Sequence, residues 1–529
     1  MFDKWNNLKK KIQEKCIMPY KQGEIYFMSI GKNIGYEVLG KDELFLRPVL
    51  VYKKLSKQTF IGILLSSKEK HGTYFFNFRY SKKTESTALL NQIRVFDIRR
   101  AEYCDGNISI SDFGKLKGKL LTLLDITPNP KGKGSGYSSK NMKLPKSEII
   151  ISKKYLDVKP IPVNTPLLDG NEKNYLNECI DTGWISSEGP FVSRFEKEMA
   201  QYVGRKYATA CSSGTAALDI AISALNLEKD DEVIMPTFTI ISCCQALVKQ
   251  GIKPVLLDSD LRTFNIKVED IEAKITSKTK AIMIVHIFGL SVDIDPILDL
   301  AKKYDLKIIE DAAQMIGQEY KGKKCGSFGD ISIFSFYPNK QITTGEGGMV
   351  LCDDENLDER AKSFRNLCFT SDRFIHHELG YNYRMTNIQA ALGVAQLEQI
   401  DKIVEKKRWI AKEYNELLKD IECISLPIDE TNYCKNIYWV YTIVLKDDFH
   451  KTSKEIMKEL GSYKIGTRPF FYPMHRQPVF NNMGLFLDEE LKNSEKLYEK
   501  GFYIPSGLAL TKQDIRRVSE VLHKLLKVN

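Results

Sequence analysis

Several residues whose types could do chemistry follow runs that are typical of buried strands. The run LKIIED ends at Asp311, Gln314 comes three residues later, and Lys340 precedes the glycine-rich turn GEGG. In parallel sheets, ligand-binding groups lie at the carboxyl ends of the strands. Upstream, the segment SSGTA begins at Ser212 and precedes an apolar helical stretch, where free amides at a helix N-terminus suit a phosphate group. The spacing predicts a ligand site that combines a phosphate seat, a carboxylate and an amine.

These residue types suit the chemistry of pyridoxal 5'-phosphate. A lysine amine forms a Schiff base with the aldehyde of this cofactor. A carboxylate keeps the pyridine nitrogen of the cofactor protonated, so that the ring can accept electrons from a substrate carbanion. Such a lysine needs a lowered pKa, which burial near cationic groups provides. The same residues also fit a surface lysine, a helix cap and a plain capping turn, so the residue types alone leave both interpretations open.

The chain after residue 160 alternates between apolar strands and helical stretches. The strands are EVIMP, KPVLLD, KAIMIVH, LKIIED, ISIFSF and GGMVLC. Continuous apolar strands separated by helices indicate a mainly parallel sheet covered on both faces, which is an α/β fold. One long helix is predicted to begin at Thr386, which fits a capping box with Gln389, and to run to Lys407.

The first 125 residues have a different composition. Short runs rich in Ile, Val, Phe and Tyr occupy 23–123, with turn residues between them, and such short strands suggest a small β-barrel. Gly114 to Leu124 is a candidate closing helix, and a stretch rich in Pro, Gly, Ser and Lys follows. The expected domains are a β-barrel over 1–125, a linker over 126–159, a large α/β domain over 160–409 and a small α+β domain over 410–529.

Charge is unevenly distributed along the chain. The first 150 residues hold 28 Lys and Arg against 14 Asp and Glu, a balance of +14, whereas the rest hold 50 against 54, a balance of −4. A basic first part suggests an anionic partner such as nucleic acid, although a solvated Lys-rich surface gives the same excess.

The sequence carries no sign of a membrane span, a secretion signal or a metal site. No apolar run approaches the roughly 18–20 residues that a spanning helix needs, and the start, MFDKWNNLKKKIQEK, has no apolar centre. The 11 Cys are scattered, without CxxC pairs or zinc-type Cys/His spacing. We expect reduced thiols, no metal and a cytoplasmic protein.

Residues 160–529 resemble the DegT/DnrJ-type sugar aminotransferases, which are fold-type I pyridoxal phosphate enzymes. The resemblance rests on GWISSEGPFVSRFE, SSGTAAL, DEVIMPTFT, EDAAQ, GSFGDISIFSF, NKQITTGEGGMV and GYNYRMTNIQAALGVAQLEQID. It implies that Lys340 is the Schiff-base lysine, that Asp311 pairs with the pyridine nitrogen and that Gln314 hydrogen-bonds the ring hydroxyl. It also implies the residues that hold the cofactor phosphate, which are Gly214, Thr215, Ala216 and Ser335.

Active sites of this family lie at a dimer interface. The resemblance therefore implies a homodimer in which Asn382 and Arg384 reach the cofactor phosphate or the substrate of the partner subunit. Many relatives stack an aromatic residue on the cofactor ring where this chain has Ile240. Some relatives replace the lysine with histidine and act as dehydratases, so the presence of Lys340 favours transamination.

Two further stretches, VNTPLLDGNEKNYLNECIDTGWISSEGPF and TRPFFYPMHRQPVF, look most like GDP-perosamine synthases. Those enzymes move an amino group from glutamate onto the C-4 keto carbon of GDP-4-keto-6-deoxymannose. The resemblance implies a role in the synthesis of surface polysaccharide such as O-antigen, with His475 and Trp184 as either substrate-side or structural residues. The sequence itself does not distinguish a GDP sugar from a UDP or dTDP sugar.

Residues 19–124 resemble the PemK/MazF-type toxin fold through QGEIYFM, GYEVLGKDELFLRPVLVYKK, FIGILLSS and LLNQIRVFDIRRAEY. Toxins of this fold cut single-stranded RNA without a metal. By position, Arg47 would act at the scissile phosphate, and Ser66, where these toxins more often have Thr, would help to position the 2'-OH. The alternative is an inactive barrel kept for RNA binding, dimerisation or tethering. The competing function for the whole chain is an RNA-acting toxin with the aminotransferase domain as an appendage.

Overall fold

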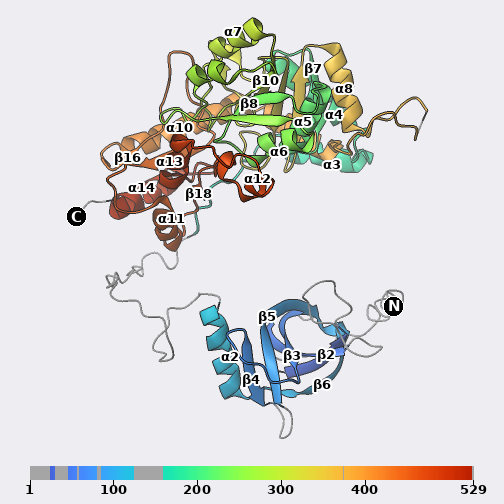
Figure 1. Cartoon of the computed structure of the whole chain (residues 1–529), viewed down its shortest axis with the longest axis vertical. Coiled ribbons are helices and arrows are strands. Elements are labelled where there is room, and N and C mark those ends of the chain that lie inside the picture. Colours follow the sequence, from blue (N-terminus) through green and yellow to red (C-terminus); the bar gives the residue numbers. More distant parts are fainter. Residues whose placement is uncertain are drawn as a thin grey trace. The chain divides into compact units, whose positions relative to one another are not determined.

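The computed structural model describes residues 24–29, 46–55, 59–79, 85–123, 159–372 and 374–526. The chain divides into two compact units, Met1–Lys146 and Ser147–Asn529, which Figure 1 draws in blue and in green to red. The predicted linker, 126–159, lies outside the described residues except for its last residue. The predicted domain boundaries stay predictions.

A seven-stranded sheet forms the centre of the larger unit, in the order β7-β15-β14-β11-β10-β8-β9. Every neighbouring pair from β14 to β9 is parallel, whereas β15 is antiparallel to both β14 and β7. Only β15 therefore runs against the rest, which confirms the predicted, mainly parallel sheet. The strands are β7 (Tyr207–Cys211), β8 (Glu232–Pro236), β9 (Lys253–Leu257), β10 (Thr279–Val285), β11 (Lys307–Asp311), β14 (Ile331–Ser335) and β15 (Gly348–Cys352).

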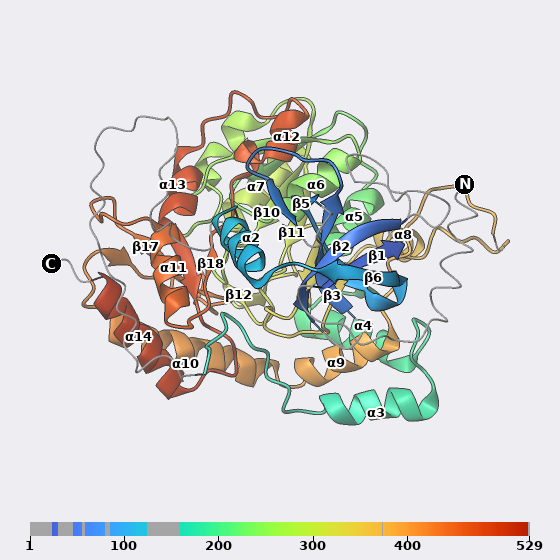
Figure 2. The same ribbon diagram turned by 90° about the horizontal axis from the view of Figure 1, so that it is seen from below.

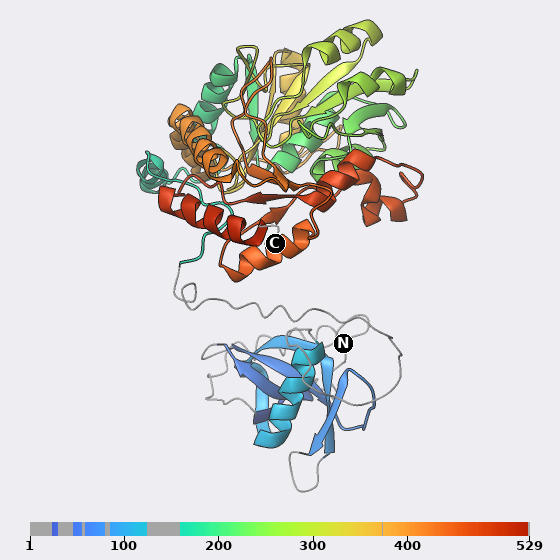
Figure 3. The same cartoon turned by 90° about the vertical axis from the view of Figure 1, so that its left-hand side faces the viewer.

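Helices cover both faces of this sheet, as Figure 3 shows. Alternate residues of a strand point to opposite faces. On β10, Ile282 and Ile284 pack into one apolar cluster with α4, α7 and α9, whereas Met283 and Val285 pack into another with α5, α6 and α8. The helices are α3 (Glu172–Thr182), α4 (Pro190–Val203), α5 (Gly214–Ala224), α6 (Ile241–Lys249), α7 (Asp295–Tyr304), α8 (Glu355–Arg365) and α9 (Asn387–Leu397).

The single long helix predicted from Thr386 to Lys407 is two helices, and that prediction was wrong. Helix α9 ends at Leu397 and α10 (Ile400–Leu418) follows, although the predicted capping box of Thr386 and Gln389 is present. Between them lies Glu398. Its carboxylate accepts hydrogen bonds from Arg194 of α4, from Tyr175 of α3 and from Asn171, which directly precedes α3. The break occurs where the packing partners change, because α9 packs on α3 and α4 whereas α10 packs on α14.

The C-terminal part of the larger unit is an α+β arrangement around a small antiparallel sheet, in the order β16-β17-β19-β18. Figure 2 shows α10 and α14 beside this sheet. Apolar residues of both helices, including Tyr414 and Ile515, form one core with the sheet. The remaining elements are β12 (Glu319–Tyr320), β13 (Lys323–Lys324), β16 (Ile424–Ser425), β17 (Tyr441–Leu445), α11 (Ser453–Ser462), β18 (Arg468–Pro469), α12 (Pro478–Asn482), α13 (Lys492–Lys500), β19 (Gly501–Ile504) and α14 (Lys512–Leu526).

The smaller unit is one antiparallel sheet in the order β4-β5-β3-β2-β1-β6, followed by a helix. Among the described strands, no pairing joins the edge strands β4 and β6. The described strands therefore form a small antiparallel sheet, and the predicted closed barrel is not found among them. The predicted closing helix begins earlier, at Ile110. The elements are β1 (Glu24–Ser29), β2 (Leu46–Lys54), β3 (Thr59–Ser66), β4 (Phe75–Arg79), β5 (Glu85–Asp97), β6 (Ala101–Asn107) and α2 (Ile110–Leu123).

Both faces of this small sheet carry apolar side chains. Leu50 and Ile63 lie in a cluster with Leu116 of α2, whereas Val49 and Leu64 lie in a cluster on the other face. In the part of the chain that the structure describes, no helix of either unit has the length and apolar character needed to cross a membrane.

Candidate active site

A cavity of about 370 Å³ opens at the carboxyl ends of the parallel strands. Asp311 is the last residue of β11 and Ser335 the last of β14, while the segment after β7 supplies Gly214 and Thr215. These strands run in the same direction, so their carboxyl ends meet at one edge of the sheet. The lining residues are Ser213, Gly214, Thr215, Leu218, Ile240, Ser242, Asp311, Ala313, Gln314, Ile333, Ser335, Tyr337, Asn339, Lys340, Glu346, Trp439, Phe471 and Tyr503.

The N-terminus of α5 forms one wall of the cavity. Ser213 caps the helix, and its hydroxyl accepts a hydrogen bond of 3.1 Å from the Ala216 amide. A Cβ added to Gly214 would lie 2.7 Å from the Ser335 Cβ, so only glycine lets the helix start approach β14 this closely. The first amides of a helix have no partner within the helix. This wall therefore offers amide and hydroxyl donors to an anion. The Ala216 amide is not among them, because it already donates to the Ser213 hydroxyl.

Asp311 lies almost fully buried at the floor of the cavity. The Ala313 amide donates to its Oδ1 at 2.9 Å, and the Cys243 thiol donates to its Oδ2 at 3.1 Å. Burial raises the pKa of Asp311, against the lowering effect of these hydrogen bonds and of Lys340. The carboxylate is thus held in one orientation by two donors.

Gln314 and Lys340 complete the polar floor. The Gln314 Oε1 accepts a hydrogen bond of 2.5 Å from the Phe288 amide, which fixes the side-chain amide of Gln314. Lys340 Nζ lies 4.1 Å from the ring centroid of Trp439, whose indole N–H donates to the Asn339 carbonyl at 2.7 Å. Burial lowers the pKa of Lys340 to about 8, although the charge of the Asp311 carboxylate acts in the other direction. A lysine in this setting holds a neutral amine much more readily than a surface lysine does.

Two predicted residues, Asn382 and Arg384, are not among the cavity lining. Arg384 donates to the Asn366 side-chain oxygen at 2.6 Å, and Asn382 forms an isolated bridge with Asn366. Both belong to a segment that lies beside Cys211 at the end of β7.

His475 and Trp184 also lie outside the cavity lining. His475 is buried, and its two ring nitrogens contact the Thr237 hydroxyl at 2.8 Å and Glu495 at 2.9 Å. Trp184 is half-exposed, and its carbonyl accepts from Asn387 at 2.6 Å. The buried contacts of His475 fit a structural position, whereas the ring of Trp184 is half-exposed and its hydrogen bond is made by the backbone.

Some cavity residues were missed by the sequence analysis. Ser242, whose hydroxyl lies 2.8 Å from that of Thr215, follows a strand end and was within reach of the same argument that found Asp311. Trp439 and Tyr503 come from the C-terminal part of the unit and no local pattern marks them. Ile240, which stands where many relatives have an aromatic residue, does line the cavity.

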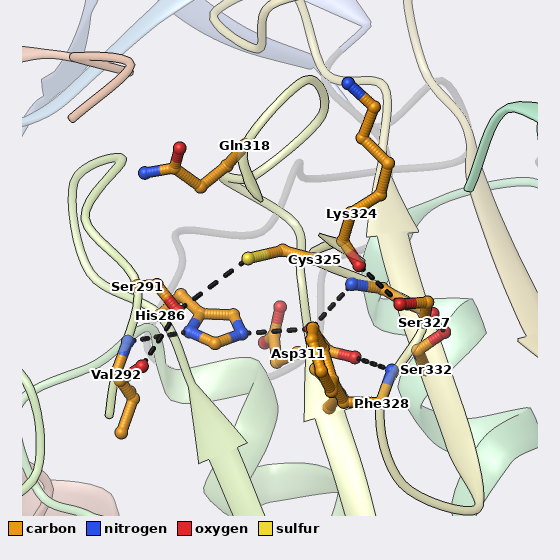
Figure 4. A network of polar contacts seen from close by, with 12 residues as sticks. His286, Ser291, Val292, Asp311, Gln318, Lys324, Cys325, Ser327, Phe328 and Ser332 are labelled. Carbon is orange, nitrogen blue, oxygen red and sulfur yellow. Dashed lines mark hydrogen bonds and ion pairs between the residues drawn. The ribbon is translucent and has the colours of Figure 1, made fainter. Parts of the chain in front are cut away.

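One group of residues within the described part of the chain has the composition of a metal site: His286, Glu310 and Cys325. Figure 4 shows His286 and Cys325 in a network of polar contacts. The Val292 amide donates to His286 Nδ1, so Nε2 carries the proton and donates to Glu310 at 3.0 Å. The Glu310 carboxylate also accepts hydrogen bonds from two loop amides, those of Gly326 and Phe328. Because these donor atoms are used within the protein, we assign a structural role to the group.

In the smaller unit, Arg47 lies on β2 and Ser66 ends β3. The pairing of these strands places Val49 opposite Leu64. Burial lowers the pKa of the Arg47 guanidinium. The two residues singled out in the sequence therefore lie on neighbouring antiparallel strands.

Comparisons with known proteins identify the larger unit. The profile of the DegT/DnrJ/EryC1/StrS aminotransferase family matches residues 166–523. The chain belongs to this family. Over 371 residues it is 40% identical to the GDP-perosamine synthase of Caulobacter vibrioides, covering 70% of this chain and 99% of that protein. It is 41% identical over 362 residues to the GDP-perosamine synthase of Vibrio cholerae, covering 68% and 97%. The solved structure of the aminotransferase PseC from Helicobacter pylori matches with a TM-score of 0.66 at 26% identity, covering 70% of this chain and 99% of that one.

The chain is thus a sugar aminotransferase with a fold-type I architecture, and its cofactor is pyridoxal 5'-phosphate. The cavity fits this group. Gly214 leaves open a cradle that a Cβ would close against Ser335, a buried carboxylate is held at the floor, and a lysine with a lowered pKa lies beside it. The family match begins after the smaller unit, at residue 166, and therefore gives no function to that unit.

Proposed function

We propose that this aminotransferase moves an amino group from glutamate to the C-4 keto carbon of GDP-4-keto-6-deoxymannose and so makes GDP-perosamine for surface-polysaccharide synthesis. The observation that carries the proposal is the identity of 40–41% to two GDP-perosamine synthases over 97–99% of their lengths. A UDP- or dTDP-linked 4-keto sugar is the alternative substrate.

Within this proposal, each residue at the cavity floor has a distinct role. When bound, the cofactor supplies an aldehyde for the incoming amino group and a ring that takes up electron density. The Asp311 carboxylate would hold a proton at the pyridine nitrogen, and Gln314 would donate to the ring hydroxyl. Lys340 would hold the cofactor covalently and, once released, carry the proton to and from the reacting carbon. Its lowered pKa supports this role, because a proton shuttle works best near the ambient pH.

The phosphate of the cofactor would lie against the N-terminus of α5. Gly214 and Thr215 supply the helix start, and the Ser335 and Ser242 hydroxyls lie beside it. The positive end of the helix dipole favours an anion there. Ile240 would cover the ring by aliphatic contact, since it lines the same cavity.

The proposal includes a homodimer with shared active sites. Asn382 and Arg384 lie outside the cavity lining of their own chain. They would instead reach the cofactor phosphate or the substrate in a second copy. His475 would affect the substrate only through the segments that it holds, whereas the half-exposed Trp184 side chain would contact the substrate.

The decisive experiment is an assay of the purified full chain with glutamate against GDP-, UDP- and dTDP-linked 4-keto-6-deoxy sugars. We expect amino-sugar product from the GDP sugar and none from a Lys340→Ala control. Product from the UDP or dTDP sugar alone would refute the GDP assignment and leave the aminotransferase assignment standing.

For the smaller unit, we propose a PemK/MazF-like fold that binds RNA without cleaving it. The charge balance of +14 over the first 150 residues and the positions of Arg47 and Ser66 on neighbouring strands support an anionic partner. Serine at the position where toxins of this fold more often have threonine, and the hazard of an active nuclease on a biosynthetic enzyme, favour binding over cleavage.

A further inference from the structure

The thiol of Cys243 contacts the carboxylate at the floor of the active site. Cys243 lies in the first turn of α6, is fully buried, and donates from Sγ to Asp311 Oδ2 across 3.1 Å. Helix α6 begins directly after Ile240, and its Ser242 contacts Thr215. One helix start therefore contacts both the phosphate seat and the carboxylate.

The contact needs a protonated thiol, and its surroundings keep it protonated. Burial and the charge of Asp311 raise the pKa of Cys243 well above its usual value. The Thr239 hydroxyl lies 3.5 Å from the same sulfur. Cys243 therefore acts as a neutral donor to the carboxylate, and the carboxylate does not act as its base.

The thiol determines which part of the carboxylate faces the cavity. Oδ1 already accepts from the Ala313 amide, so the Cys243 contact fixes the second oxygen and prevents rotation of the group. The other titratable groups that act on Asp311 are Lys340 and His286. A thiol is a weaker donor than a hydroxyl. The thiol therefore orients Oδ2 and leaves more negative charge on this oxygen, which can attract a proton inside the cavity.

We propose that Cys243 is a positioning residue of this aminotransferase, whose S–H group orients Asp311 Oδ2 toward the pyridine nitrogen of the cofactor. The proposal rests on the role given to Asp311 above. It assigns Cys243 no direct contact with cofactor or substrate.

The test compares three variants of the full chain, Cys243→Ala, Cys243→Ser and Cys244→Ala. Cys244 is the matched control, because it is equally buried on the same helix and no contact with Asp311 is found. We expect Cys243→Ala to lower kcat about threefold to tenfold, which corresponds to the loss of one modest hydrogen bond. Cys243→Ser should restore most of this loss, and Cys244→Ala should leave kcat unchanged.

A second measurement needs no cofactor. The thiol stabilises the ionised form of Asp311, so its removal raises the pKa of that carboxyl further. The resulting loss of stability appears where the carboxyl is charged, at higher pH. In protein stripped of cofactor, the fall in Tm caused by Cys243→Ala, measured from acid to alkaline pH, should be larger where the carboxyl is charged than at the acid end of the range, where it is protonated. In an Asp311→Asn background, this pH dependence should vanish.

Several results would overturn the proposal. An equal fall in Tm at every pH of the range, or the same fall in the Asp311→Asn background, would leave Cys243 as a packing residue only. If Cys243→Ala fails to fold, the infrared S–H stretching band decides instead. It should shift between wild type and Asp311→Asn, and an unchanged band refutes the contact. Neither readout depends on the sugar substrate, so a wrong substrate assignment would not disturb it.

Discussion

At the scale of single residues, the active site combines two titratable groups whose pKa values burial moves toward each other. Burial raises the pKa of Asp311 and lowers that of Lys340 to about 8. Burial disfavours the charged form of either group, and each charge favours the other. Burial thus makes a neutral Lys340 amine more accessible, whereas Lys340 and the hydrogen bonds to Asp311 favour the ionised form of the carboxyl.

Replacement of Asp311 by Asn should impair turnover far more than cofactor binding. The amide cannot hold a proton on the pyridine nitrogen by charge, whereas the phosphate seat at Thr215 and Ser335 is untouched. We expect kcat to fall at least about a hundredfold, as for other groups that stabilise developing charge. Steady-state kinetics and cofactor titration of the same preparation measure the two effects. Turnover close to wild type would mean that Asp311 does not face the ring.

The lowered pKa of Lys340 predicts a pH dependence of cofactor capture. In protein stripped of cofactor, the neutral amine is the attacking form, and its fraction falls about tenfold per pH unit below the pKa. The rate of pyridoxal phosphate uptake, followed by absorbance, should rise with pH and level off above about 8. A rate that keeps rising toward the usual pKa of lysine would contradict the burial of this amine.

At the scale of elements, the close approach of α5 to β14 sets the size of the phosphate seat. In Gly214→Ala, the new Cβ would lie 2.7 Å from the Ser335 Cβ, so the helix start must shift. We expect cofactor affinity to fall at least about tenfold and stability to fall by about 1–3 kcal/mol, as overpacking usually does. Equilibrium dialysis and thermal unfolding measure these effects.

A matched glycine controls for the change of residue type. Gly461 lies in α11, and an added Cβ there meets no atom within 4 Å. Gly461→Ala should leave cofactor affinity unchanged and stabilise the protein slightly, because alanine favours helix more than glycine. Equal effects of the two substitutions on affinity would show that the seat tolerates a wider approach.

The sequence predicted the elements that carry their own local pattern. Asp311 was found because it ends an apolar strand, and the Thr386 cap because its partner lies three residues away, whereas Ser335 came only from the family resemblance. Trp439 was missed because its contact with Lys340 joins segments about 100 residues apart. The end of α9 was missed because Glu398 is held by Tyr175 and by other side chains distant in sequence. Residues fixed by such long-range contacts leave no periodic signal in the chain.

At the scale of the whole larger unit, a buried lysine connects α10 to the wall of the active-site cavity. Lys407 of α10 is 1% exposed and donates to the carbonyls of Trp439 at 2.9 Å and Ser506 at 2.7 Å. Trp439 in turn contacts Lys340. Burial lowers the pKa of Lys407 to about 7. Lys407 therefore connects α10 to Trp439, a residue of the cavity lining.

Lys407 predicts how stability depends on pH. Below about pH 7 both the folded and the unfolded chain bind the proton, and the full destabilisation by the buried charge is present. As pH rises from about 7 to about 10, the folded state loses its proton first and this destabilisation disappears. The stability of wild type relative to Lys407→Met should therefore rise over this range, as measured by denaturant unfolding. The exposed Lys412→Met variant should run parallel to wild type.

For the whole chain, the basic smaller unit predicts RNA binding that weakens steeply with salt. Contacts of Lys and Arg with phosphate release counterions, so affinity for single-stranded RNA should fall strongly as salt rises.

Because a balance of +14 gives some binding even without a function, cleavage is the sharper measurement. We expect the purified chain to leave single-stranded RNA intact in the presence of EDTA. Metal-independent cleavage that disappears in Arg47→Ala would contradict this, because a guanidinium beside the scissile phosphate can stabilise its developing charge and a methyl group cannot. With aminotransferase activity retained in Arg47→Ala, that result would make the chain bifunctional.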